Sequence, residues 1–314
     1  MNKTTKIIIA SLWFAIAFML TVVLVKGING TFSFRNFNVD NKGWSYNLTS
    51  NVETISTGVN TELSTFSESF SNIDIDLVNE DFILEVWNNN YTEITIESSF
   101  DESKRPKINL SDNTLQIKAP NRNNVRVLNS QDKVVVKIPE NLGKKLNKVN
   151  IDVVSGAILV SSIVSELTSA STVSGRISLD GCDFEELRTN SVSGNSNVTQ
   201  SSVQEIISES ISGQIRISSD ISKNFECSAV SGDIIVETNK MPSLGGDCET
   251  VSGSVKIYLP ENNGFVLDYQ STSGSITNEF TGSKMKKSGE NSYKSGGIDF
   301  DVETISGSIS ISKI

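Results

Sequence analysis

The sequence predicts an all-β protein: a β-solenoid of single-stacked parallel coils of about 19 residues, preceded by a strand-rich lead-in and one N-terminal transmembrane helix. Three observations carry this prediction: a Ser-Gly pair that recurs at a fixed interval, apolar residues that alternate with polar ones, and an uncharged apolar run near the N-terminus. A fixed period of this length indicates units that bury their apolar faces only by stacking on their neighbours.

The Ser-Gly pairs mark the predicted coils. The first four intervals are each 19 residues long, and the later intervals are longer. Positions three and five after each serine are mostly Ile, Val or Leu, and strand alternation places them on the inward face with the glycine and with the residue before the serine. The serine itself is expected to point outward. The repeat residues are Ser155, Gly156, Ser174, Gly175, Ser193, Gly194, Ser212, Gly213, Ser231, Gly232, Ser252, Gly253, Ser273, Gly274, Ser306 and Gly307.

A second apolar column is expected thirteen residues after the serine, where it would form a weaker strand of each coil. The glycine is expected to leave room that a larger residue would obstruct. The residues of this second column are Leu187, Ile206, Phe225, Leu244 and Phe265.

The chain divides into four predicted parts. Residues 1–26 form a cytoplasmic tip and membrane anchor, 27–69 a tether, 70–150 a strand-rich lead-in that is the first part of the solenoid or its cap, and 151–314 the repeats. Residues 281–297 interrupt the last interval as a loop or hairpin. We expect this insertion to cover the free edge that the final strand, 309–311, would otherwise expose.

The anchor is predicted from residues 7–25, a run of 19 residues without a charge. At 1.5 Å per residue such a helix nearly spans a bilayer. Lys26 follows the run and no small-x-small cleavage site is present, so an uncleaved single-pass anchor is favoured over a cleaved signal peptide and a secreted form. Lysines precede the span, so the C-terminal body is expected outside the cytoplasm, at the cell membrane.

Composition limits the chemistry. The chain has no histidine and a formal charge of -10. The usual general base and the commonest zinc ligand are therefore missing, and nucleic acid is an unfavourable partner because its phosphates would be repelled. No catalytic residue, cofactor or metal site is expected. Acidic residues within 74–81 lack the spacing of a calcium loop and are expected to be edge and turn residues.

The cysteines offer one covalent link. Cys227 and Cys248 each precede a repeat serine by four residues, which places them in one column on adjacent coils. They form either a disulfide, strained between adjacent parallel strands, or a ladder of two buried thiols. Cys182 is left without a partner of this kind.

The serial V-S-G-x-I units, the lead-in that ends in V-V-V-K-I-P at 134–139 and the closing E-T-I-S-G-S-I-S-I at 303–311 resemble the bacterial putative-adhesin family, a domain of unknown function built from β-strand repeats. The likeness covers residues 70 to 314. The family usually has Asp after the repeat glycine, which here remains only as Asp233. The resemblance implies a membrane-attached or cell-surface protein without catalytic residues, linked in some members to envelope-stress operons.

Two functions are consistent with these features. The first is a non-enzymatic, membrane-anchored envelope protein, an adhesin or binding scaffold whose polar rod binds a surface glycan or an envelope protein. The second is a regulatory or assembly component of an envelope-stress system that acts through a membrane protein partner.

Overall fold

The computed structural model describes residues 39–40, 43–44, 59–120, 132–283 and 285–314. The expected membrane span, residues 7–25, lies outside these ranges. Within them, no helix is both long enough and apolar enough to cross a bilayer. A short antiparallel pair, β1 (Val39–Asp40) and β2 (Gly43–Trp44), precedes the main body.

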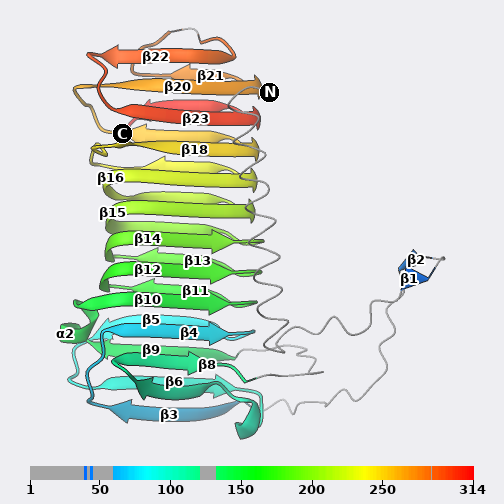
Figure 1. Cartoon of the computed structure of the whole chain (residues 1–314), viewed down its shortest axis with the longest axis vertical. Coiled ribbons are helices and arrows are strands. Elements are labelled where there is room, and N and C mark those ends of the chain that lie inside the picture. Colours follow the sequence, from blue (N-terminus) through cyan, green and yellow to red (C-terminus); the bar gives the residue numbers. More distant parts are fainter. Residues whose placement is uncertain (1–38, 41–42, 45–58, 121–131, 284) are drawn as a thin grey trace.

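The main body is a rod of stacked parallel coils (Figure 1). Each coil places one strand on a first side of the rod and the next strand on a second side, and each strand pairs in parallel with its counterparts in neighbouring coils. On the first side Ile151 pairs with Ala170, and on the second side Ile158 pairs with Ile177, in both cases 19 residues apart. The predicted all-β, β-solenoid-like fold is therefore confirmed.

The central coils follow one another in sequence order. β15 and β16 each run through both sides of the rod, because the corner between the two sides stays extended in these coils. The central strands are β10 (Leu146–Val153), β11 (Ile158–Ser161), β12 (Val164–Thr172), β13 (Ile177–Asp180), β14 (Asp183–Ser191), β15 (Ser196–Ser212), β16 (Ile215–Ser231), β17 (Ile234–Glu237), β18 (Gly245–Ser252) and β19 (Val255–Leu259).

At the N-terminal end the order of the coils departs from the sequence. The coil of β4 and β5 lies between that of β8 and β9 and that of β10 and β11, and the helix α2 (Glu140–Gly143) carries the chain past it. Antiparallel strands then close this end: β7 pairs with β8, β6 with β9, and β3 with β6. The bounds are β3 (Asn60–Phe66), β4 (Asn72–Leu77), β5 (Asp81–Trp87), β6 (Thr92–Ser98), η1 (Glu102–Lys104), β7 (Lys107–Ser111), β8 (Thr114–Lys118) and β9 (Lys133–Pro139).

At the C-terminal end the order of the coils also departs from the sequence. β23 pairs with both β18 and β20, and β24 pairs with both β19 and β21, so the last coil of the chain fills the space between the two coils that precede it. The C-terminus accordingly lies below β20 and β22 in Figure 1. The expectation that strand 309–311 ends the rod was wrong. The bounds are β20 (Gly264–Ser273), β21 (Ile276–Asn278), β22 (Ser288–Lys294), β23 (Asp299–Ser306) and β24 (Ile309–Lys313).

The insertion at 281–297 contains β22, which pairs in antiparallel register with β20. It therefore covers the outer edge of β20 and not the final strand, which has a partner on each side. Edge strands that are left open invite pairing with other chains, so covering the edge protects this end of the rod.

Apolar and small side chains fill the interior of the rod in columns. The residues at plus three and plus five are buried in every repeat, as predicted, although Ser196 and Asn278 interrupt the columns. The prediction that the residue before each repeat serine lies in the core was wrong. Val173 is half-buried, whereas its neighbour Thr172 points inward, because the chain begins to turn before it reaches the serine.

The second apolar column also differs from the prediction at one position. Leu187, Ile206 and Phe225 are buried, but Leu244 is 68% exposed. The interval from Ser231 to Ser252 is 21 residues long, and its additional residues precede β18. Gly246 therefore takes the place in the column beside Phe225.

Candidate functional site

The repeated serines form one exposed edge of the rod. All eight are exposed, and their strands bring them into register: Ser212 with Ser231, Ser231 with Ser252, and Ser306 between Ser252 and Ser273. The repeat serines point outward, as predicted. The edge presents hydroxyl groups, which can donate and accept hydrogen bonds, at each coil that carries a Ser-Gly pair.

The glycine beside each serine is required by contact between backbones. A Cβ added at Gly213 would lie 2.1 Å from the carbonyl oxygen of Gly194, and one at Gly194 would lie 1.7 Å from that of Gly175. Each glycine thus packs directly on the carbonyl group of the coil below it. Any side chain at this position would force two coils apart.

The residue after the glycine links neighbouring coils when it has a short acceptor side chain. The Oδ1 atom of Asp233 accepts a hydrogen bond from the backbone N–H of Ser254 at 2.8 Å, and Asn195 accepts one from Gln214 at 3.0 Å. Asp81, which follows Glu80, accepts a hydrogen bond of this kind from the backbone N–H of Ala157. This contact gives a physical reason for Asp after the glycine, and it is structural.

The remaining acidic residues near Asp81 are also held by the fold. Glu80 accepts hydrogen bonds from the N–H groups of Val78 and Asn79. Asp74 forms an ion pair with Lys118 at 2.8 Å. Burial raises the pKa of Asp74, but its contacts with Lys118 and Asn150 outweigh that effect and leave the pKa below its ordinary value. No grouping of acidic or cysteine side chains in the described ranges has the geometry of a metal site.

The three cysteines are buried free thiols. Cys227 and Cys248 are register partners on adjacent coils, which places them in one column as predicted, and they form the ladder of thiols instead of the disulfide. Burial raises the pKa of Cys182 to about 11 and raises that of Cys248 well above its usual range. Thiols held protonated in this way are poor nucleophiles and poor metal ligands.

Carboxylates stack along the outer surface of the first side. Glu226, Asp247, Asp301 and Asp268 are register partners on four neighbouring coils. Like charges in one column repel anions from this surface. It therefore favours a neutral or basic partner.

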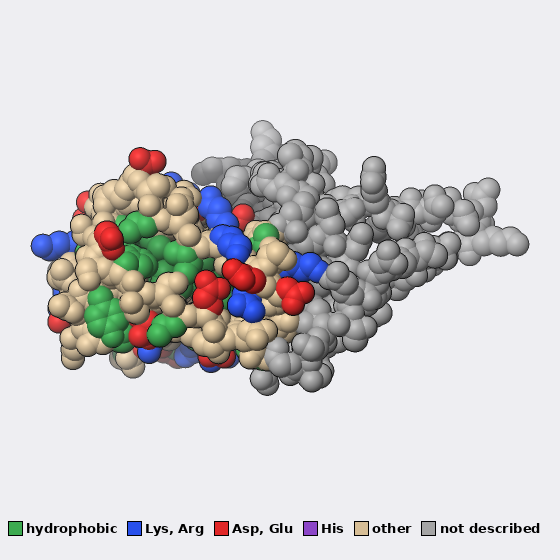
Figure 2. Space-filling model, turned by 90° about the horizontal axis from the view of Figure 1, so that it is seen from below, with side chains coloured by type: hydrophobic (Ala, Val, Ile, Leu, Met, Phe, Trp, Pro, Cys, Tyr) green, Lys and Arg blue, Asp and Glu red, His purple; other side chains and the backbone are tan. Residues whose placement is uncertain are grey.

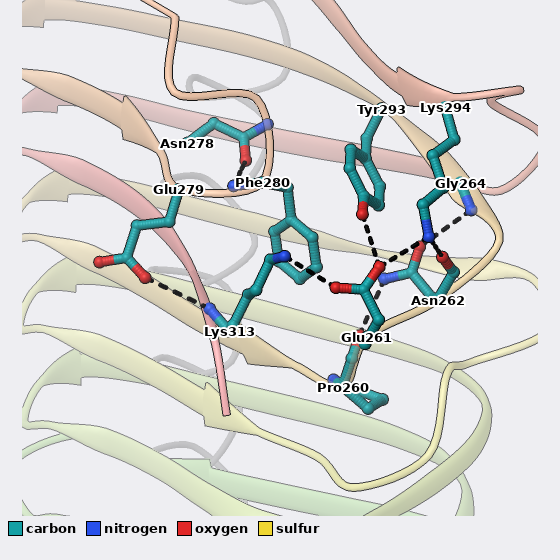
Figure 3. Close-up of polar contacts among 10 residues, drawn as sticks. All are labelled: Pro260, Glu261, Asn262, Gly264, Asn278, Glu279, Phe280, Tyr293, Lys294 and Lys313. Carbon is teal, nitrogen blue, oxygen red and sulfur yellow. Dashed lines mark hydrogen bonds and ion pairs between the residues drawn. The ribbon is translucent and has the colours of Figure 1, made fainter.

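A polar cluster fixes the C-terminal end of the rod (Figure 3). The carboxylate of Glu261 accepts hydrogen bonds from Lys294 Nζ at 2.6 Å, from Lys313 Nζ at 2.7 Å and from the Tyr293 hydroxyl at 2.5 Å. These three contacts lower the pKa of Glu261 to about 2, and the carboxylate raises the pKa of both lysines. The cluster joins the loop after β19 to β22 and β24.

The N-terminal end carries a cleft that the sequence did not reveal. Three segments line it: Phe66 at the end of β3 with residues 67–69 that follow, residues 90–91 with Thr92 at the start of β6, and Pro139, Asn141 and Leu142 where β9 meets α2. The cleft is small, with a volume of about 50 Å³, and it opens to solvent. We assigned 66–69 to a tether, and the other two segments lie far away in the sequence, so only the folded chain brings them together.

The end face beside β3 is partly apolar. Seen from below, hydrophobic side chains gather in its middle and charged side chains lie around them (Figure 2). Leu63 on β3 is 61% exposed.

The stacked parallel coils define an all-β, solenoid-like class of protein. The chain belongs to the Toastrack DUF4097 family, whose sequence profile matches residues 70–312. The resemblance to a putative-adhesin family is thereby confirmed. No curated protein matches the chain.

Two solved structures share the fold. A putative adhesin from Bacteroides fragilis is 15% identical, with a TM-score of 0.51 over 83% of this chain and 99% of that one. A putative adhesin from Parabacteroides distasonis is 14% identical, with a TM-score of 0.50 over 82% of this chain and 97% of that one. At this identity the likeness concerns the fold.

Proposed function

We propose that this chain is a non-enzymatic protein of the cell envelope, anchored in the cell membrane by residues 7–25, which displays the rod outside the cytoplasm as an adhesin or binding scaffold. The observation that carries the proposal is the exposed serine edge on a continuously hydrogen-bonded stack of coils. Such a stack is stiff because each coil is paired with its neighbours, and it presents a serine hydroxyl at each coil that carries a Ser-Gly pair.

Three further observations support a binding role. The two solved structures that share the fold are both described as putative adhesins. The buried thiols and the saturated carboxylate of Glu261 are held in structural contacts, which leaves them poorly suited to chemistry. The carboxylate column on the first side disfavours anionic partners, so we expect a neutral glycan or a basic protein surface.

Retention of envelope components on the full chain tests the proposal. The chain is purified in a detergent without sugar head groups, coupled to beads and incubated separately with a polysaccharide fraction and a membrane-protein fraction of the envelope. We expect the polysaccharide to be retained intact. Retention of neither fraction, or release of shortened glycan, would contradict the proposal; retention of one membrane protein alone would favour the regulatory alternative.

The anchor has its own test. Protease added to intact cells is expected to digest a C-terminal tag, and mass spectrometry of the membrane fraction is expected to find a peptide that begins at Met1. An N-terminus beyond residue 25 would show that the segment is a cleaved signal.

A further inference from the structure

We propose that the cleft at the N-terminal end binds one ring of a neutral saccharide, an inference that deepens the proposed function and rests on it. The volume of the cleft is about 50 Å³. Sites that enclose drug-sized ligands span roughly 300 to 1,000 Å³. The cleft therefore receives only one edge of a single sugar ring, and its open side leaves the rest of that ring and of a longer chain in solvent.

The aromatic walls of the cleft are held in place by the protein itself. Trp87 Nε1 donates a hydrogen bond to the carbonyl oxygen of Tyr91 at 2.9 Å, and the two rings meet edge to face with centroids 5.0 Å apart. Phe66, which also lines the cleft, contacts Phe70 with ring centroids 6.2 Å apart. A site whose rings are fixed before binding loses little conformational entropy when the ligand arrives.

The polar groups of the cleft suit a ligand rich in hydroxyl groups. Asn90 and Asn141 are exposed, and each amide can both donate and accept, as a sugar hydroxyl can.

The charge of the cleft selects against anions. Its lining contains the carboxylate of Glu68 and no lysine or arginine. Phosphate, sulfate and uronic acid groups would find no cation and would be repelled, whereas neutral hydroxyls can donate to Glu68. A flat ring with apolar C–H faces for Tyr91 and Phe66 and hydroxyls for the amides matches this combination best.

Saturation-transfer NMR on the full chain, in a detergent without sugar head groups, tests the proposal. The probes are glucose, galactose, mannose and N-acetylglucosamine, with glucuronic acid as the anionic comparison. We expect signal from at least one neutral sugar, none from glucuronic acid, and an affinity loss of about tenfold or more in Tyr91→Ala. Asn90→Ala, an exposed turn substitution, is expected to weaken binding without lowering the melting temperature.

Tyr258→Ala is the matched control, because Tyr258 is a half-exposed tyrosine on β19, outside the cleft. It should bind as the unchanged protein does. Absence of signal from every neutral sugar, or signal that persists equally in Tyr91→Ala and Asn90→Ala, would overturn the saccharide site. If the NMR experiment overturns the saccharide site while the bead assay still retains polysaccharide on Tyr91→Ala, the proposed function stands without the cleft; if neither the unchanged protein nor any variant retains an envelope component, the proposed function fails as well.

Discussion

Lys313 donates a hydrogen bond through Nζ to Oε2 of Glu261 at 2.7 Å, and this contact joins the last strand of the chain to a loop 52 residues earlier. Lys313 ends β24, which is inserted between β19 and β21. The same carboxylate holds Tyr293 and Lys294 of β22, the strand that covers β20. One side chain thus fastens both the inserted coil and the strand that closes the end of the rod.

Glu261→Gln is expected to lower the melting temperature and to remove part of its dependence on pH. The folded-state pKa of Glu261 is lowered to about 2 from an ordinary value of 4.5. Its contribution to stability is therefore present above about pH 4.5 and is lost as the pH falls toward 2. Melting curves of the unchanged protein and of Glu261→Gln should differ at pH 7 and converge near pH 2.

Glu205→Gln is the control, because Glu205 has a single ion pair, with Lys223 at 3.2 Å, on an exposed part of the rod. A single exposed pair of this kind contributes little, whereas the carboxylate of Glu261, which is also exposed, has three partners on two different strands. A difference between the Glu261→Gln and unchanged proteins that stays constant from pH 7 to pH 2 would contradict the assigned role of the carboxylate.

Gly213→Ala is expected to destabilise the rod by about 1–3 kcal/mol, and Gly213→Val by more, because the new Cβ would lie 2.1 Å from the carbonyl oxygen of Gly194. Ser212→Ala removes an exposed hydroxyl and should change stability by no more than about 0.5 kcal/mol. Urea unfolding of the variants measures the difference. Equal stabilities of Gly213→Ala and Ser212→Ala would show that the coils can separate at little cost.

The sequence predicted the repeat and its inward and outward faces well, because strand alternation and a fixed period are local properties. Ile177 and Ile215 lie in the core, and Ser212 lies on the exposed edge. The order of the coils at the two ends could not be predicted in this way. The coil of Ser306 carries the same Ser-Gly pair as its neighbours, and its place between Ser252 and Ser273 depends on pairing with β18 and β20, which lie far from it in the sequence.

The candidate saccharide site was missed for a related reason. Phe66 ends β3, Tyr91 precedes β6 and Asn141 lies in α2, and none of them forms part of the repeat. Their proximity follows from the antiparallel strands that close the N-terminal end, which carry no periodic signal. The aromatic residues beside the asparagine-rich turn at 88–90 were the only local sign.

Gly246→Ala is expected to destabilise the protein by about 1–3 kcal/mol, because its Cβ would lie 2.4 Å from the ring of Phe225. Gly246 separates Phe225 from Phe300, whose rings stack across it with centroids 5.9 Å apart. Combining Gly246→Ala with Phe225→Leu should cost less than the sum of the two single substitutions, since the smaller side chain admits the methyl group. Strictly additive free energies of unfolding would argue against this packing.

A chain that ends at residue 298 is expected to lose the structure of the coil formed by β20 and β21. This truncation removes β23 and β24, the strands on which that coil is stacked. Hydrogen exchange should then find residues 264–278 unprotected, whereas residues 215–237 in the central coils remain protected, because their partners on both sides are intact.

A synthetic peptide of residues 299–314, added to the truncated chain, should restore protection by taking the place of the missing strands. The same peptide with Ile309→Asn, which places an amide in the core, should restore much less protection. Protection of 264–278 in the truncated chain without any peptide would mean that the coil packs on β18 and β19 directly, and that the inserted coil is not required to hold this end of the rod.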